Sequence, residues 1–244
     1  MLQPQPWHLS EPPPTPFAGA ASPADPEAAA AAEPALVLLN RRETVPTSLL
    51  QHLETLLEAS ERRRHAAFRQ AADRERFLLG RAALRLLLGA WLSVPPEAVP
   101  LPTGLHGKPH CPGGPSFNLS HSGDLVLLAL HPSRPVGVDV EALRPDVAWE
   151  PVAQRLFTSV EQEALQACPA AEQPGTFLDL WCRLEARLKA RGLGLAGLEA
   201  LRAEDHQVSL AGDGSTTVRG AAESIWAVAV PSGYRAAVAM APAR

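Results

Sequence analysis

The stretch Val136–Glu141 constrains the fold of this chain more than any other part of the sequence. Its residues, VGVDVE, alternate between apolar and small or acidic types with a period of two, which predicts a β-strand. Because side chains alternate between the two faces of a strand, the three valines share one face, and Asp139 and Glu141 share the other. Two adjacent carboxylates repel each other unless a cation lies between them, and such oxygen ligands favour Mg²⁺ or a similar hard ion. The pattern therefore predicts either a metal site or an edge strand with a solvated polar face.

Composition limits the classes of protein that remain. With 244 residues, 46% of them hydrophobic, the chain can form one large domain or two fused small ones. A net charge of -4 gives no support to nucleic-acid binding. Three cysteines without CxxC spacing predict reduced thiols. Neither a signal-peptide pattern nor an apolar run of membrane-spanning length is present in the sequence, so we expect a soluble cytoplasmic protein that does not contact membranes.

The remaining chain reads as a succession of helices and strands after a Pro- and Ala-rich segment, residues 1–34, which we expect to be a mobile tail. The expected helices span Ser48–Glu58, Glu61–Phe68 (capped by Ser60), Asp73–Leu92, Asp146–Phe157, Ser159–Gln166 (opening with a capping box) and Thr176–Arg191. The expected strands, besides the acidic one, are Ala35–Leu39, Ser116–Leu119, Leu125–Leu130, Val208–Leu210, Ser224–Val230 and Arg235–Met240.

Lysine is rare in this chain. Nearly all of the positively charged side chains are arginines, and the only lysines are Lys108 and Lys189. These positions are candidates for sites that require a compact ammonium, although chance placement is the alternative. Lys108 lies in a Gly-Lys-Pro turn and could contact a phosphate, but this tripeptide is common in turns. Ser120 and His121 lie where a strand is expected to become a turn, which could offer an imidazole, hydroxyls and N–H groups to an anion. An ordinary loop histidine is the alternative.

The helix expected at Thr176–Arg191 carries the second informative pattern. Glu185 and Lys189 are four residues apart on the flank of its apolar stripe, where they form either an ordinary i,i+4 pair or a third metal carboxylate with a cationic neighbour. The stripe, which we expect to be the core face, consists of Phe177, Trp181, Leu184 and Leu188.

These motifs together resemble the Sfp-like phosphopantetheinyl transferases over roughly residues 36–241. The matching pieces, in the order of that family, are Asp73-x-x-Arg76 with Leu78-Leu79-Gly80, Gly107-Lys108-Pro109, Phe117–Ser122, Val136–Glu141, Phe157-Thr158-x-x-Glu161 and Trp181-x-x-x-Glu185-Ala186-x-x-Lys189-x-x-Gly192.

The resemblance implies an α/β (α+β) fold of two similar halves, residues 35–132 and 133–244, related by a pseudo-twofold axis with the active site in the cleft between them. It also implies a monomeric enzyme that transfers the 4′-phosphopantetheine arm of coenzyme A to a serine hydroxyl of an apo acyl or peptidyl carrier protein. The other product would be adenosine 3′,5′-bisphosphate. Carriers of this kind serve fatty acid, polyketide or nonribosomal peptide biosynthesis.

The resemblance also implies roles for single residues. Glu185 would be the general base, and Lys189 would stabilise charge on the leaving bisphosphate. Mg²⁺ would be held by Asp139, Glu141 and Glu185, and the nucleotide phosphates would be bound by Arg76, Lys108 and His121, with Ser120 nearby.

One position departs from the family pattern, because Leu184 stands where the family usually has a lysine before the glutamate. The apolar stripe should accept Leu184, but a positive charge near the phosphates is lost. A coenzyme A-binding homologue with weak or no transferase activity is therefore an alternative. A metal-dependent phosphodiesterase that removes the arm is a second one, although it would not need both phosphate-binding loops.

Overall fold

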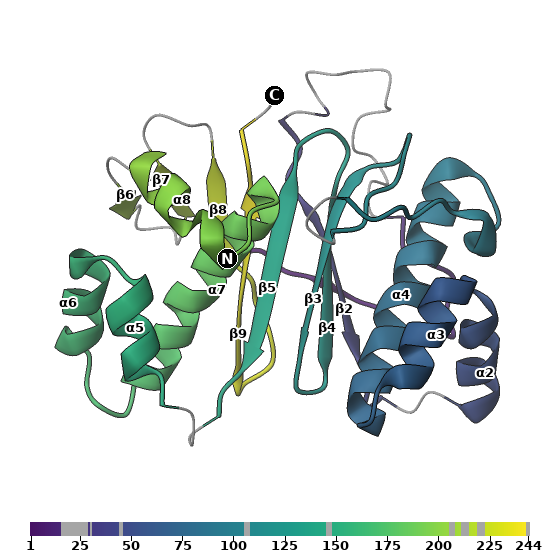
Figure 1. The fold of residues 1–244 in the computed structure, drawn as a ribbon, viewed down its shortest axis with the longest axis horizontal. Coiled ribbons are helices and arrows are strands. Elements are labelled where there is room, and N and C mark those ends of the chain that lie inside the picture. Colours follow the sequence, from purple (N-terminus) through teal and green to yellow (C-terminus); the bar gives the residue numbers. More distant parts are fainter. Residues whose placement is uncertain are drawn as a thin grey trace.

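The computed structural model of the chain describes residues 1–15, 29, 31–43, 46–104, 108–144, 148–204, 208–210, 215–218 and 223–242. Two β-sheets stand side by side in the middle of the molecule, and helices cover the outer side of each (Figure 1). The predicted α/β (α+β) class is confirmed. Within the described residues, none of the helices is both long and apolar enough to cross a lipid bilayer.

The first sheet has the strand order β1-β2-β4-β3, and the second has the order β5-β9-β8-β7-β6. The strands of the first sheet are β1 (Gln5–Pro6), β2 (Ala35–Asn40), β3 (Ser116–Ser122) and β4 (Leu125–His131). Those of the second are β5 (Val136–Ala142), β6 (Val208–Leu210), β7 (Ser215–Val218), β8 (Ser224–Ala227) and β9 (Tyr234–Met240). Residues 132–135 connect the two sheets, and the division into halves near residue 132 stays a prediction.

The helices divide between the sheets in the same way (Figure 1). Beside the first sheet lie α2 (Thr47–Thr55), α3 (Ala59–Ala67), α4 (Ala71–Leu92) and the 3₁₀ turn η1 (Pro96–Ala98). Beside the second lie α5 (Glu150–Leu156), α6 (Ser159–Ala167), α7 (Gln173–Arg191), η2 (Leu195–Gly197) and α8 (Leu198–Glu204).

Strand β4, LVLLALH, is buried throughout and is apolar up to His131, because both of its faces are covered. One face, which includes Val126 and Leu128, packs with the leucines of α4. The other face, which includes Leu125 and Leu127, packs in a core shared with Val138 of β5. The three valines of the acidic strand point into this shared core as predicted, and Asp139 lies on the opposite face.

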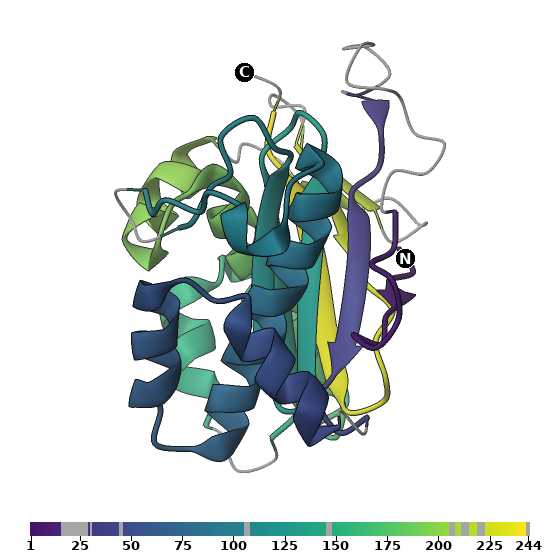
Figure 2. The same cartoon turned by 90° about the vertical axis from the view of Figure 1, so that its right-hand side faces the viewer.

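The first residues of the chain pack on the first sheet. Strand β1 pairs in parallel with β2, Gln5 opposite Val37, and Trp7 is buried at 3% exposure. Figure 2 shows this purple segment beside β2 at the margin of the sheet. This part of the chain therefore differs from the mobile tail expected for residues 1–34, whereas residues 16–28 and 30 of that segment lie outside the described residues.

Several expected boundaries are wrong. His121 and Ser120 are in strand β3 and not in a turn, because the β3–β4 hairpin turns tightly at Gly123, which has a positive φ of 56°. Helix α3 begins before Ser60, and the N–H of Glu58 donates to Glu61. The capping box of α6 is Thr158–Glu161 instead of Ser159–Gln162.

The helix expected from Asp146 begins at Glu150, and residues 145–147 lie outside the described residues. Strand β7 was not predicted from the sequence. A turn that Gly212, Asp213 and Gly214 favour in the sequence lies outside the described residues.

The two sheets meet where β3 lies along β5, the edge strand of the second sheet. Side chains of β3 accept hydrogen bonds from three N–H groups of that edge, so the sheets are joined here without a continuous backbone ladder. These bonds run from Val136 N to Ser116 Oγ (3.3 Å), from Val138 N to Asn118 Oδ1 (2.9 Å) and from Ala142 N to Ser122 Oγ (3.1 Å).

Helix α7 lies directly on β5 and β9. A Cβ atom added at Gly137 would be 2.1 Å from the carbonyl oxygen of Ala186 and 2.2 Å from the amide nitrogen of Ala190, so backbone meets backbone at this point. Small residues of α7, namely Cys182, Ala186 and Ala190, form the cluster that faces the sheet.

The stripe that the sequence predicted as the core face of α7 accounts for only part of its buried surface. Phe177 and Leu184 pack in a cluster with α5 and α6, and Trp181 packs against both this cluster and the sheet-facing one. The expectation that helix packing accepts Leu184 is confirmed, because this side chain packs against that cluster.

Candidate active site

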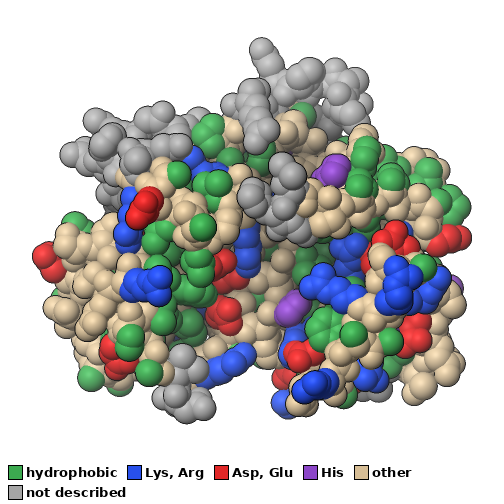
Figure 3. Space-filling view, viewed as in Figure 1, with side chains coloured by type: hydrophobic (Ala, Val, Ile, Leu, Met, Phe, Trp, Pro, Cys, Tyr) green, Lys and Arg blue, Asp and Glu red, His purple; other side chains and the backbone are tan. Residues whose placement is uncertain are grey.

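A cavity of about 360 Å³ opens where β3, β5 and α7 come together. Figure 3 shows acidic, basic and histidine side chains gathered around a hollow in the middle of this face. Six of the residues predicted from the sequence line the cavity, and the elements that carry them are far apart in the chain. The lining consists of Leu119, Ser120 and His121 from β3, Asp139 and Glu141 from β5, and Trp181, Glu185 and Lys189 from α7.

Asp139 is the most buried of the charged residues in this lining, at 2% exposure. Its Oδ1 accepts hydrogen bonds from Lys189 Nζ at 2.5 Å and from Ser120 Oγ at 2.9 Å. Its Oδ2 is also buried, but it has no hydrogen-bond partner among the described residues. A buried carboxylate oxygen without a partner is costly, so Oδ2 is positioned to accept a ligand from the cavity.

Glu141 is half-buried beside Asp139, and Ser122 Oγ donates a hydrogen bond to its Oε2 at 2.7 Å. Burial raises the pKa of the Glu141 carboxyl; the Ser122 bond opposes the rise, and the negative charge of Asp139 adds to it. The same Ser122 hydroxyl accepts the N–H of Ala142, so β3 holds both the backbone and the side chain of this part of β5.

Glu185 faces the two carboxylates of β5 from α7. Burial raises the pKa of its carboxyl; the ammonium of Lys189 opposes this, and the charges of Asp139 and Glu141 add to it. A carboxylate whose pKa is raised is a stronger base than an ordinary surface glutamate.

The chemistry of these side chains fits a hard divalent cation. Asp139, Glu141 and Glu185 offer oxygen ligands to one cavity, and Asp139 Oδ2 lacks another partner in the described structure. In the described part of the chain, no three acidic, histidine or cysteine side chains are already grouped as a metal site. The ammonium of Lys189 forms an ion pair with the other oxygen of Asp139. The three carboxylates are therefore balanced by one positive charge from the protein.

Arg76 of α4 lies near the β3 side of the cavity. Its guanidinium donates to the carbonyl of Gly123 at 2.5 Å and forms an ion pair with Asp73. Burial lowers the pKa of His121, and the positive charges of Arg76 and Lys189 lower it further. His121 is therefore a neutral imidazole above the ordinary histidine pKa of 6.5, in a region of positive potential that suits an anion.

Lys108, like Arg76, is absent from the described lining of the cavity. Its ammonium donates to the carbonyl of Val136 at 3.1 Å and to the carbonyl of Lys189 at 2.7 Å. Burial, together with repulsion by Lys189, lowers the pKa of Lys108 to about 8. Gly107, the first residue of the predicted Gly-Lys-Pro motif, lies outside the described residues.

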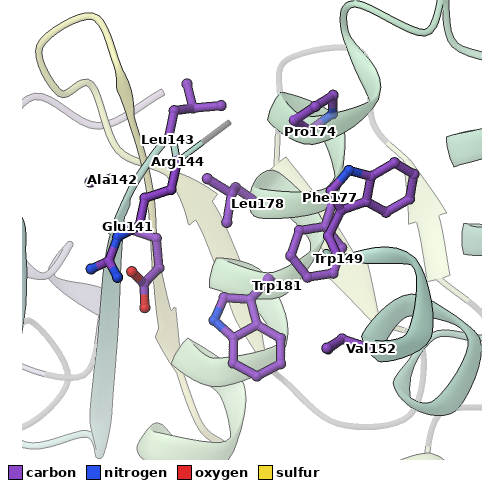
Figure 4. Close-up of a pocket in the computed structure, with 10 residues that line it drawn as sticks. All are labelled: Glu141, Ala142, Leu143, Arg144, Trp149, Val152, Pro174, Phe177, Leu178 and Trp181. Atoms are coloured by element: carbon purple, nitrogen blue, oxygen red, sulfur yellow. The ribbon is translucent and has the colours of Figure 1, made fainter. Parts of the chain in front are cut away.

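A second cavity, of about 300 Å³, shares Glu141 and Trp181 with the first. Figure 4 shows Trp149, Phe177 and Trp181 on one side of it, and Glu141 with Arg144 on the other. This cavity was not predictable from the sequence, because its walls come from β5, α5 and α7 and their pairing depends on the tertiary fold.

The polar residues of β3 were also only partly identified. Positions 116, 118, 120 and 122 are Ser, Asn, Ser and Ser, a polar pattern with a period of two that marks one face of a strand. This signal was present in the sequence, but the assignment of residues 120–122 to a turn concealed it.

Comparison with known proteins gives matches across both halves of the chain. Residues 45–133 match the family model described as "4'-phosphopantetheinyl transferase, N-terminal", and residues 135–239 match the model of the "4'-phosphopantetheinyl transferase superfamily".

Individual relatives agree with these matches. The 4'-phosphopantetheinyl transferase HetI of Nostoc sp. is 38% identical over 161 residues, which cover 64% of this chain and 68% of the relative. The 4'-phosphopantetheinyl transferase psf-1 of Bacillus pumilus is 34% identical over 174 residues, which cover 70% of this chain and 71% of the relative. A putative 4'-phosphopantetheinyl transferase of Synechocystis sp. is 32% identical over 153 residues, 61% of this chain and 62% of the relative.

Proposed function

The chain belongs to the 4′-phosphopantetheinyl transferase superfamily, and on that basis we propose that it transfers the 4′-phosphopantetheine arm of coenzyme A to a serine hydroxyl of an apo acyl or peptidyl carrier protein. The observation that carries the proposal is the cavity that brings Asp139, Glu141, Glu185 and Lys189 together at the seam of the two halves. Phosphoryl transfer depends mainly on charge neutralisation and on positioning, and this group of side chains supplies both.

The carboxylates would hold Mg²⁺, which neutralises charge on the coenzyme A pyrophosphate when it is bound. Support comes from the unpartnered oxygen of Asp139 and from the shared cavity of Asp139, Glu141 and Glu185. Glu185 would accept the proton of the carrier serine, since its raised pKa favours proton uptake. Lys189 would stabilise the charge that develops on the leaving adenosine 3′,5′-bisphosphate.

The nucleotide phosphates would lie on the β3 side of the cavity, next to His121, Ser120 and Arg76. The apolar second cavity would receive the arm, because it opens beside Glu141 and Trp181 and offers aromatic walls. The carrier would then approach Glu185 from the open side of the first cavity. A cytoplasmic location, expected from the sequence, and a monomeric state, implied by the resemblance, are part of the proposal.

Incubation with coenzyme A, Mg²⁺ and purified apo carrier proteins from fatty acid, polyketide and nonribosomal peptide systems tests this proposal. Intact mass spectrometry should show addition of the phosphopantetheine arm to at least one carrier. The same carrier with its acceptor serine replaced by Ala should remain unmodified.

A coenzyme A-binding homologue with little transferase activity is the second candidate, and Leu184 favours it. This side chain packs in an apolar cluster at the position where a lysine was expected, so it supplies no charge to the phosphates. Coenzyme A binding without mass addition across the whole carrier panel would establish this candidate. If the protein neither binds coenzyme A nor adds mass to any carrier, both candidate functions are contradicted.

The proposed phosphate contacts predict a separation of kinetic constants. Arg76→Ala and His121→Ala should each raise KM for coenzyme A, by about tenfold for Arg76, while kcat changes less, because a charge-assisted contact to a phosphate is lost. Steady-state kinetics at saturating carrier measures both constants. Arg74→Ala is the matched control, since Arg74 lies in the same helix but is exposed and donates to Phe68 O. Wild-type KM values for both variants would exclude a phosphate role for these residues.

A further inference from the structure

Lys108 joins the two halves of the molecule at the point where α7 lies on β5. It belongs to the segment that precedes β3, but its ammonium binds two carbonyls of the other half. One is Val136 O, at the start of β5, and the other is Lys189 O, in the last turn of α7. The two acceptors belong to different elements, so a single ammonium connects the end of the helix to the beginning of the strand.

The contact between these two elements has little side-chain interlocking to keep it in register. At Gly137 the helix backbone touches the strand backbone, and the residues around it, Ala186 and Ala190, are small. Such a surface permits close approach but offers few side chains that resist sliding. Val136 is adjacent to Gly137, so Lys108 binds immediately beside this contact.

A cation is favoured at the carbonyl of Lys189 for a second reason. The last carbonyls of a helix carry partial negative charge and have few partners within the helix. Lys189 O accepts a bond from Gly192 N at 3.2 Å, and Lys108 adds a second, charged donor at 2.7 Å.

Lys189 is thereby held at both of its ends. Its carbonyl binds Lys108, while its own ammonium binds Asp139 at 2.5 Å and the carbonyl of Val138 at 3.4 Å. A shift of the last turn of α7 would move the ammonium away from Asp139. Glu185, one helical turn earlier, would move with it.

We propose that Lys108 is a positioning residue that joins the last turn of α7 to the start of β5 and so places Lys189 and Glu185 opposite Asp139, and that it does not serve as a phosphate ligand. The two carbonyls use two of the three donors of the ammonium, so binding a phosphate with more than the remaining donor would break one of these bonds. Val136 is fully buried, so its carbonyl would not regain a partner from water at low cost. The consequence for catalysis rests on the proposed transferase function, whereas the structural role does not.

Three measurements on Lys108→Met test the proposal. Hydrogen exchange of the free protein should be faster at the amides of residues 190–193, by at least about tenfold, because a charged hydrogen bond no longer restrains the last turn. The Kd for coenzyme A in the absence of carrier, from calorimetry, should stay within about twofold of the wild type. The kcat should fall by about ten- to a hundredfold, because Lys189 and Glu185 are no longer held in register.

Arg76→Met serves as the matched control with the opposite pattern, a weaker Kd for coenzyme A and unchanged exchange at residues 190–193. If Lys108→Met weakens coenzyme A binding tenfold or more and leaves the exchange of these amides unchanged, Lys108 is a phosphate ligand and the proposal is overturned. Should the methionine variant not fold, Lys108→Gln, which keeps a neutral donor, replaces it in the same measurements. If the wild-type protein modifies no carrier, the exchange and binding results still decide the role of Lys108. Failure of the proposed function is therefore distinguishable from failure of the proposal for Lys108.

Discussion

Replacing Glu185 with Gln is expected to lower kcat by about a hundredfold or more, the usual scale for the loss of a general base. The amide keeps the size and polarity of the side chain but cannot take the proton of the carrier serine. In the native protein, burial of Glu185 and the charges of Asp139 and Glu141 raise the pKa of its carboxyl, and the amide has no such proton-accepting group. Single-turnover transfer to a carrier, followed by intact mass, measures the rate of the chemical step.

Asp139→Asn is the companion variant for Glu185→Gln, because it removes a carboxylate that would bind the metal but leaves the proposed base in place. Its rate should approach that of the wild type as Mg²⁺ is raised, with a higher Mg²⁺ concentration needed for half-maximal rate. The rate of Glu185→Gln should stay low across the same titration. Full recovery of Glu185→Gln at high Mg²⁺ would show that Glu185 is a metal ligand only and that another group accepts the proton.

The site was predictable from the sequence where chemistry depends on local periodicity. The alternation in Val136–Glu141 places two carboxylates on one strand face whatever the tertiary fold, and the four-residue spacing of Glu185 and Lys189 places them on one helix face. The structure brings these two faces into one cavity with Ser120 and His121. That convergence is a tertiary contact, and only the resemblance of the ordered motifs implied it.

The partners of Lys108 were not predictable, because they are backbone carbonyls. Every residue has a backbone carbonyl, so the sequence does not show that those of Val136 and Lys189 bind Lys108. A Gly-Lys-Pro turn, in contrast, resembles many phosphate-binding turns. Similarly, the sheet-facing side of α7 consists of Cys182 and two alanines, whose weak hydrophobic signal is hidden by the larger Phe177 and Leu184 on another side. Sequence periodicity therefore identified a buried stripe of α7 but not the side of the helix that lies on the sheet.

The close approach of α7 to β5 makes Gly137→Ala the substitution with the largest expected effect on stability, a loss of about 4 kcal/mol or more in the free energy of unfolding. The added methyl carbon would lie 2.1 Å from Ala186 O and 2.2 Å from Ala190 N, and both are backbone atoms that no rotamer change can move. Relief requires α7 to move away from β5, which also carries Glu185 and Lys189 away from Asp139, so transferase activity should be lost with stability.

Urea unfolding followed by circular dichroism measures the effect of Gly137→Ala, and Gly194→Ala is its control. A Cβ atom at Gly194 would meet nothing within 4 Å, and its φ of −83° suits alanine, so that variant should stay within about 0.5 kcal/mol of the wild type. The comparison separates crowding at the helix–strand contact from the general effect of removing a glycine. A Gly137→Ala protein with the unfolding midpoint of the wild type would mean that α7 does not rest on the backbone of β5, and the placement of Lys189 over Asp139 would then need another cause.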